Sequence, residues 1–493
     1  MYFAIAQQEA QVVGPLPIFD CRLPIGKVTN KECDDQYLCS RNENRQSAIK
    51  IGNLLSFVVR LRTMSEPDIR PSIRTEAIAG ITTFFTMAYI VVVNPSILAT
   101  PGTGMAFSGV LTATVLVCFS MTLMMGLYAK LPFAVAPGMG INAFFTFTII
   151  LTQKVWWQVA LGIVFWAGVL FLLISITPIR ETIAKAIPGE LRVGTAAGIG
   201  IFLTFIGLKN AGFIASDPVT FVRLGTLDIK TLLAIGGLVI TIVLLVRRSV
   251  FAFLSGIILV TLIAWFTGLI PTPEHFFSPP DFKTVFLKLD IFGALKLSLI
   301  PAIIAILFTD LFDSISTFIG VAHASNLLDE QGNPKNLRQG LIVDSFATFG
   351  AGLSGTSSGT AYIESISGIN MGGRTGLTSV FTALCFLPCF FIAPIAGMVP
   401  PFATAPVLIL VGASMFKSVG QIRFSKIEEG FPAFLTIILI PLTFSITQGI
   451  LWGFISHVGL YLLVGRRRDI HPVMYVLAFI SIALLLIEHV KWN

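Results

Sequence analysis

Long apolar runs joined by short polar connections determine what this chain can fold into. Apolar residues make up 55% of its 493 residues and charged residues only 12%, whereas a soluble domain usually has about 25% charged residues. A helix needs roughly 20 apolar residues to cross a bilayer. We therefore expect an all-α polytopic membrane protein with fourteen segments, near 76–98, 105–128, 139–152, 156–177, 190–208, 230–246, 250–269, 293–321, 338–353, 363–372, 375–397, 401–416, 429–447 and 449–465.

The third and tenth of these segments are short, and each follows a helix-breaking stretch. Residues 131–142 contain two prolines and two glycines before the third segment, and residues 354–360 are rich in Gly, Ser and Thr before the tenth. Interrupted segments at matching positions in two halves of a transporter indicate an inverted repeat with the binding site between the halves. The pattern predicts two inverted repeats of seven segments with discontinuous third and tenth members.

Lys and Arg residues predict the orientation of the chain. Most of them fall in alternate connections, such as those holding Arg74, Arg247, Arg338 and Arg466, and the positive-inside rule assigns these connections to the cytoplasm. We therefore expect a multi-pass protein of the cytoplasmic membrane (inner or plasma membrane) with its N-terminus inside. The net charge of +7 follows from this bias, so it indicates no nucleic-acid partner.

Both ends of the chain differ from the region between them. Residues 1–63 lack a long apolar run and read as a disordered extension or an over-long start, since Met64 opens an ordinary cytoplasmic beginning. Residues 64–465 form the predicted transporter domain. The tail, 466–493, contains a further apolar segment at 473–487, which is short for a span and is left open as a crossing, packing or interfacial helix.

Glu364 follows the Gly/Ser/Thr-rich run and is the first candidate site residue. Irregular backbone at membrane depth is tolerated where it is buried in protein or lines a cavity. A carboxylate beside it is costly and is a functional hypothesis by default. The alternative is a polar loop outside the membrane followed by an ordinary helix.

Asn142 stands in the matching place in the first half, in the first turn after the Pro/Gly-rich stretch. Its amide offers both a donor and an acceptor, which suits a heterocycle edge of mixed polarity. The alternative is that Asn142 caps its own helix.

Three further acids fall in apolar spans. Asp310 and Asp313 are three residues apart and share a helix face, and Asp344 lies in the next span. Carboxylates without nearby cations favour the protonated form, so one of these acids is a candidate for proton coupling. The alternative roles are helix capping, hydrogen bonds between helices and, for Asp344, orientation of the eighth or tenth span.

The stretches 82–95, 136–146, 308–320 and 355–365 resemble the AzgA-like purine permeases, a branch of the nucleobase–cation symporters related to the uracil permease. The resemblance runs from about residue 65 to 465. It implies a core domain (spans 1–4 and 8–11) that moves against a gate domain (spans 5–7 and 12–14), with short strands in the third and tenth segments meeting at the substrate.

The resemblance also implies roles for individual residues. Asn142, Asp310 and Glu364 match purine-contacting positions, and Asp313 matches a second acid needed for transport. Tyr362 matches an aromatic residue near the base. From the residues themselves, the face of a purine could lie on Tyr362 or Phe133.

These observations predict a secondary active transporter that imports purine nucleobases (hypoxanthine, guanine or adenine) by proton symport, with sodium as the alternative coupling ion. The sequence leaves the preferred purine and a homodimer open. No catalytic residue, metal site or cofactor is expected, since Cys33 and Cys39 lack histidine partners and no nucleotide motif occurs. The alternatives are an anion transporter of the same fold, of the sulfate or bicarbonate kind, and an integral membrane enzyme.

Overall fold

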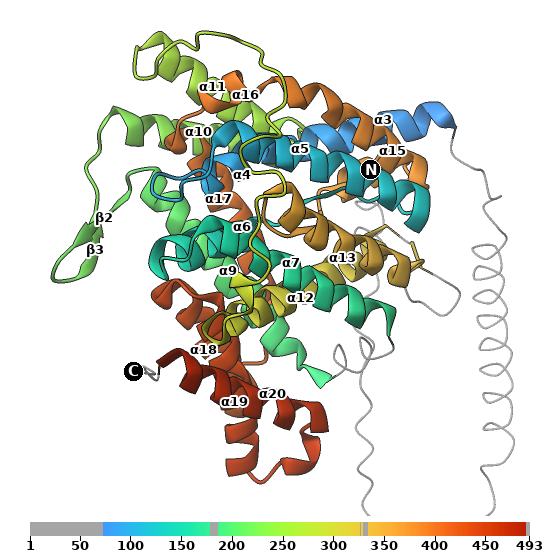
Figure 1. The fold of residues 1–493 in the computed structure, drawn as a ribbon, viewed down its shortest axis with the longest axis vertical. Helices are drawn as coiled ribbons and strands as arrows, with labels where there is room; N and C mark the ends of the chain where they lie inside the picture. Colours follow the sequence, from blue (N-terminus) through green and yellow to red (C-terminus); the bar gives the residue numbers. More distant parts are fainter. Residues whose placement is uncertain (1–71, 178–185, 326, 329–333, 490–493) are drawn as a thin grey trace, which may run out of the picture. The chain divides into compact units, whose positions relative to one another are not determined.

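The computed structural model describes residues 72–177, 186–325, 327–328 and 334–489. The chain divides into two units, Met1–Arg70 and Pro71–Asn493, and all the described residues belong to the second. The predicted extension at 1–63 lies outside the described residues. Helices dominate the described part of the chain (Figure 1).

The elements of the first half follow the predicted spans, except that the span expected at 76–98 is divided between two helices. In order they are α3 (Ile73–Met87), α4 (Ile90–Leu98), α5 (Phe107–Met124), the π-helical η1 (Met125–Ala129), β1 (Val135–Pro137), α6 (Met139–Ala143), the π-helical η2 (Phe144–Thr152), α7 (Trp157–Ile176), α9 (Gly189–Asn210), β2 (Ile214–Asp217), β3 (Phe221–Leu224), α10 (Ile229–Val246) and α11 (Ala252–Phe266).

The second half departs from the predicted spans in three places. The span expected from residue 293 begins as two 3-10 turns, the tenth segment has a helix of only six residues, and the span expected at 375–397 is divided. The elements are η3 (Gly293–Leu295), η4 (Leu297–Leu299), α12 (Ile300–Ala324), α13 (Leu337–Ser354), β4 (Gly359–Ala361), α14 (Ser365–Asn370), α15 (Gly376–Phe386), η5 (Leu387–Phe391), α16 (Ala393–Gly397), α17 (Pro401–Phe416), η6 (Lys417–Gln421), α18 (Ile427–Thr443), α19 (Ile446–Leu463), η7 (Arg467–Asp469) and α20 (Pro472–His489).

Eight helices in the described ranges are long and apolar enough to cross a membrane, and four shorter apolar helices accompany them. Their outward faces are apolar too: Val239, Val243 and Val246 on α10 are all exposed. Exposing such an apolar surface to water is unfavourable, whereas contact with lipid is not. The chain is thus a multi-pass membrane protein, and fourteen segments remain a prediction.

Helices α5 and α13 end where local sequence forces them to. The α5–η1 helix closes at Lys130, which adopts a left-handed conformation (φ 56°), and Pro132 follows where a helix could not continue. Helix α13 closes at Gly355 with φ 97°. A Cβ there would lie 2.6 Å from Cγ2 of Val285, so glycine serves both the backbone conformation and the close approach.

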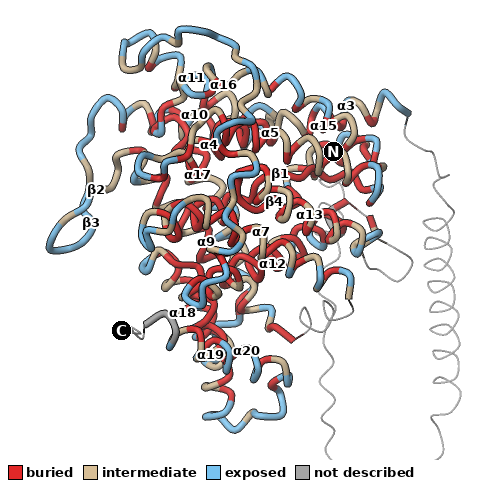
Figure 2. Tube along the Cα trace, in the orientation of Figure 1, coloured by how far each residue is buried: buried red, intermediate tan, exposed pale blue. Residues whose placement is uncertain are grey.

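Helix packing separates two sets of elements. In the first set, α7 packs on α13, α3 packs on α14 and α15, and α5 packs on β1, α13 and α15. In the second, α9 packs on α17 and α18, α18 on α19, and α10 on α11 and α17. Buried residues concentrate where these elements meet, and the connections and the β2–β3 hairpin are the exposed parts (Figure 2). This arrangement leaves the two short strands within the first set.

The apolar segment near the C-terminus forms α20, an 18-residue helix. It packs against α19, α12 and η4. Met474 and Ala478, one turn apart, belong to the main hydrophobic core, while Phe479 on another face is 74% exposed. The helix is therefore part of the packed bundle along one face.

Candidate functional site

Two short strands from opposite halves of the chain meet in the interior. β1 pairs antiparallel with β4, with Val135 opposite Ala361 and Pro137 opposite Gly359. The pairing extends beyond the strands, because Gly138 donates its N–H to Ser358 O (2.9 Å) and Tyr362 donates to Ala134 O (2.9 Å). The expectation that the third and tenth segments contain short strands that meet is confirmed.

Side chains fix the ends of this strand pair. The Tyr362 hydroxyl donates to Pro137 O (2.6 Å), and the Ser365 hydroxyl accepts from Ala134 N (3.0 Å). These bonds use backbone groups that the three-residue strands leave unpaired, and an unpaired buried backbone group is costly. Two polar residues that follow the second break, Tyr362 and Ser365, thus satisfy backbone groups of the segment that follows the first break.

A first cleft lies beside the strand pair and has an empty volume of about 480 Å³. We call it the Glu364 cleft. Its polar lining includes Tyr89, Asp313, Tyr362 and Glu364. Met415, which also lines it, lies on α17 in the second set of helices. Tyr89 lies between α3 and α4, and its hydroxyl donates to Oε1 of Glu364 at 2.6 Å. The Glu364 carboxylate is therefore held from one side and remains open to the cleft.

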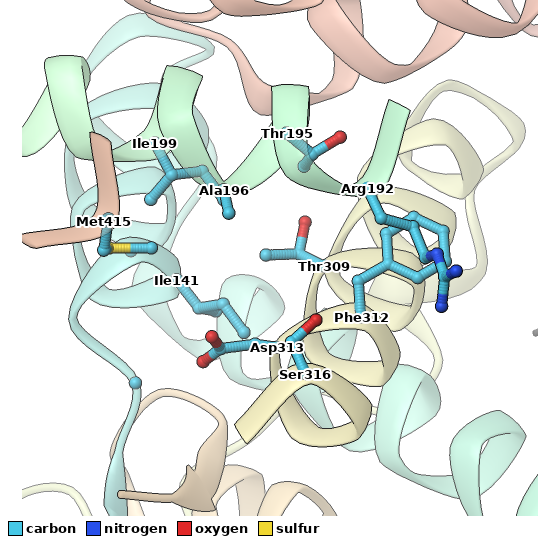
Figure 3. A pocket seen from close by; sticks show the side chains of 12 residues that line it. Ile141, Arg192, Thr195, Ala196, Ile199, Thr309, Phe312, Asp313, Ser316 and Met415 are labelled. Atoms are coloured by element: carbon cyan, nitrogen blue, oxygen red, sulfur yellow. The ribbon is translucent and has the colours of Figure 1, made fainter. Parts of the chain in front are cut away.

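A second cleft, of about 430 Å³, adjoins the first and shares Gly138, Gly140, Asp313 and Met415 with it. Figure 3 shows side chains of α9, among them Arg192 and Thr195, facing side chains of α12 across it. We call it the Arg192 cleft. Both clefts lie between the two packed sets of helices, so a movement of one set against the other would change their shape.

Beneath the clefts, three predicted site residues are fully buried: Asn142, Asp310 and Asp344. Asn142 Oδ1 accepts from the Ser357 hydroxyl. Asp310 Oδ2 accepts from the hydroxyls of Thr348 and Ser358, the latter at 2.8 Å. Asp344 Oδ2 accepts from Ala361 N at 3.2 Å. These residues support the strands and line neither cleft.

Phe133 is also buried and lines neither cleft. Its ring packs 5.0 Å from that of Phe318, within a hydrophobic cluster that includes Leu131 and Leu311. Ser379 donates a hydrogen bond to its carbonyl oxygen (2.8 Å). Among the predicted residues, the structure thus brings Asp313, Tyr362 and Glu364 together at the cleft and separates Phe133 from them.

Sequence reasoning did not find Tyr89 or Arg192. Tyr89 lies in the quoted stretch 82–95, but nothing in its local sequence indicates a partner 275 positions away. Arg192 lies near the start of the span expected at 190–208, and α9, which begins at Gly189, carries it within the first turn. The sequence signal that could have identified Arg192 is its charge in the first turn of an apolar helix.

The lining chemistry fits reversible binding of a small polar ring. Two carboxylates accept hydrogen bonds, Tyr89 and Tyr362 offer aromatic faces, and the surrounding surface is mostly apolar. The described residues contain no cluster of three or more His, Cys, Asp or Glu that could hold a metal ion. A multi-pass helical bundle with broken segments and a polar cleft beside them is typical of secondary membrane transporters.

The chain belongs to a known family of transporters. The model of the Permease family matches residues 74–451. The adenine permease AdeP of Escherichia coli (strain K12) is 43% identical over 410 residues, covering 83% of this chain and 92% of AdeP. The guanine/hypoxanthine permease PbuO of Bacillus subtilis (strain 168) is 40% identical over 418 residues, covering 83% of this chain and 96% of PbuO. The protein is therefore a permease and not an enzyme.

A solved structure shares the fold. The transmembrane domain of the cyanobacterial bicarbonate transporter BicA superposes with a TM-score of 0.58 at 17% identity, covering 78% of this chain and 98% of that domain. At this identity the likeness concerns the fold alone.

Proposed function

We propose that the protein imports purine nucleobases across the cytoplasmic membrane by proton symport. The observation that carries the proposal is the Glu364 cleft, which presents two carboxylates and two aromatic rings in a permease. Its relatives at 43% and 40% identity are named for adenine and for guanine and hypoxanthine. Purines have ring N–H groups for carboxylates and flat faces for aromatic rings.

In this proposal Glu364 accepts hydrogen bonds from the purine and Tyr362 lies against its face. Asp313, which lines both clefts, is the second acid at the site. Three further residues support the strands below the cleft: Asn142, Asp310 and Asp344. Their side chains are fully buried and form hydrogen bonds with the strand region. Phe133 keeps the start of β1 in place through its packing with Phe318.

The proposed architecture is fourteen segments in two inverted repeats, with the N-terminus in the cytoplasm. The core domain comprises α3–α7 and α12–α16, and the gate domain comprises α9–α11 and α17–α19. The packing of α7 on α13 and of α9 on α17 supports this division. Rocking of the gate against the core would open the clefts to either side in turn. A homodimer is compatible with the exposed apolar faces, which lipid would equally cover.

The anion-transporter alternative is not favoured. An anion site uses helix N-termini and cations, whereas the Glu364 cleft is lined by Glu364 and Asp313 and by no Lys or Arg. Arg192 lines the adjoining cleft, so it is the feature on which that alternative would depend.

Uptake of labelled adenine, guanine and hypoxanthine in cells that lack their own purine carriers tests the proposal. We expect saturable uptake of at least one purine, inhibited by a protonophore and independent of sodium. Uptake that follows the sodium gradient would contradict the coupling ion, and absence of purine uptake with normal surface expression would contradict the substrate class.

A further inference from the structure

Glu364 lines a third cavity in addition to the Glu364 cleft. This cavity has an empty volume of about 1360 Å³, and its walls come from α3, α14 and the connection between α10 and α11. We call it the α14 cavity. Glu364 is the one described residue that lines both spaces, so it stands where the cleft and the cavity meet.

Polar side chains continue from Glu364 along α14. Ser367 and Asn370 follow Glu364 at intervals of three residues, which puts all three on one face of this helical segment, and both line the α14 cavity. Glu364 and Ser367 are half-buried, while Asn370 is exposed. Neither the Ser367 hydroxyl nor the Asn370 amide makes a hydrogen bond to a described residue. Their donors and acceptors are therefore available to a polar solute in the cavity.

The facing wall belongs to the second packed set of helices. The ring of Phe253 on α11 lies 5.0 Å from that of Tyr89, and the ring of Phe251 lies 4.8 Å from that of Phe85 on α3. Arg248, in the connection before α11, adds a charged group to this wall. The α14 cavity thus lies at a boundary between the two sets, where a movement of one against the other would widen or narrow it.

The lining residues also reach the side of the protein that is predicted to face the cytoplasm. Arg248 belongs to the α10–α11 connection, and Met371, at the end of α14, lies three residues before Arg374. The positive-inside rule assigns both of these arginines to the cytoplasm. Arg248 and Met371 are exposed. The row of polar side chains therefore runs from the half-buried Glu364 toward an exposed, cytoplasmic end.

We infer that the purine passes between the Glu364 cleft and the cytoplasm through the α14 cavity, and that Ser367 and Asn370 bind it on the way. An amide and a hydroxyl each offer a donor and an acceptor, which suits the mixed edge of a purine. The Arg192 cleft is the rival route. It is smaller, about 430 Å³ against 1360 Å³, and it does not include Glu364 in its lining. This inference rests on the proposed function.

A bulky group attached inside the cavity tests the route. Asn370→Cys, in a background without native cysteines, is treated with a membrane-impermeant maleimide in inside-out membrane vesicles, whose outer surface is the cytoplasmic face. Exchange of labelled for unlabelled purine is then measured. We expect the maleimide to react from this face, saturating purine to slow the reaction, and the labelled protein to lose exchange. Ser367→Cys repeats the test one turn closer to Glu364.

Two further cysteine variants provide the comparison. Gly420→Cys is the matched control, because Gly420 on η6 is exposed, nothing lies within 4 Å of its added Cβ, and its connection is predicted to be cytoplasmic. It should react from the same face, without an effect of purine, and keep exchange. Ser316→Cys probes the rival route, because Ser316 is exposed and lines the Arg192 cleft but not the α14 cavity.

Asn370→Leu tests the polar contact without a label. It removes the amide at a similar side-chain size and should lower kcat/KM for exchange by about 2- to 10-fold, as expected for the loss of one hydrogen bond. Asn210→Leu is the control, since Asn210 lines none of the three spaces, and it should keep the parent's value.

Three outcomes would overturn the inference: undiminished exchange by protein labelled at both Asn370→Cys and Ser367→Cys, no reaction at either position from the cytoplasmic face, or loss of exchange on labelling Ser316→Cys alone, which would place the route in the Arg192 cleft. A parent protein that exchanges no purine would instead contradict the proposed function.

Discussion

Tyr89 and Glu364, 275 positions apart, are joined by a 2.6 Å hydrogen bond from the phenol to the carboxylate. Helix α3 ends at Met87 and α4 begins at Ile90, so the break in the first span places Tyr89 in the cleft. Its ring also lies 5.0 Å from that of Phe253 on α11. Tyr89 thus connects the carboxylate in the cleft to a helix of the second packed set.

Tyr89→Phe should weaken purine binding while keeping the ring contact with Phe253. Loss of one hydrogen bond to Glu364 costs about 0.5–1.5 kcal/mol, or roughly 2- to 10-fold in affinity. The measurement is the KM for uptake, with Tyr128→Phe as control because Tyr128 is 48% exposed. An unchanged KM in the Tyr89 variant would exclude the positioning role.

Glu364→Gln should lower purine affinity by about 1.5–3 kcal/mol, or roughly 10- to 150-fold, because one acceptor oxygen becomes a donor. Glu364→Asp keeps the charge and should lose less. Binding to purified protein measures the effect, and the exposed Glu274 supplies a matched Glu→Gln control. Parent-like binding and transport by Glu364→Gln at normal surface expression would show that the acid is structural.

Gly140→Ala should impair transport by wedging α6 against α9. The added Cβ would lie 2.4 Å from Cγ2 of Ile199, and overpacking of this kind costs about 1–3 kcal/mol. Adding Ile199→Ala removes the clashing methyl group and should restore uptake and thermal stability in detergent. Gly236→Ala is the control, since nothing lies within 4 Å of its added Cβ. Failure of the double variant to recover would refute the packing explanation.

Thiol labelling tests the predicted orientation. In a background without native cysteines, Val219→Cys in the β2–β3 connection should react with membrane-impermeant reagents in intact cells, because Val219 is 81% exposed and is predicted to lie outside. Gly465→Cys, after α19, should react only after the membrane is opened. The reverse pattern would overturn the topology.

Helix α20 is expected to cross the membrane as an additional segment after the fourteen of the two proposed repeats. It begins just after η7 and packs against η4, which precedes the start of α12. Its 18 residues give a length of about 27 Å, close to the roughly 30 Å of the hydrocarbon core. An epitope tag at the C-terminus should therefore bind antibody in intact cells, whereas a tag at Gly465 should not. Protection of both tags would place α20 on the cytoplasmic surface.

The sequence alone determined the membrane class and the helical breaks. In a bilayer, an apolar run of about 20 residues forms a membrane-spanning helix, because its backbone groups must be hydrogen-bonded within the segment. Pro132, Pro137 and Gly355 interrupt helices through local backbone effects. The same local reasoning singled out Glu364, Asp310 and Asp313, because charges in apolar spans are rare. The resemblance added the short strands.

Only the tertiary structure decided which of these residues reach the cleft. Asp310 and Asp313 share a helix, yet Asp310 is covered by Thr348 and Ser358 while Asp313 lines both clefts. Spacing along one helix cannot distinguish them, since burial depends on which neighbouring element covers each side chain. The Tyr89–Glu364 bond and the place of Arg192 beside a cleft likewise arise from packing between elements far apart in sequence, for which no local pattern exists.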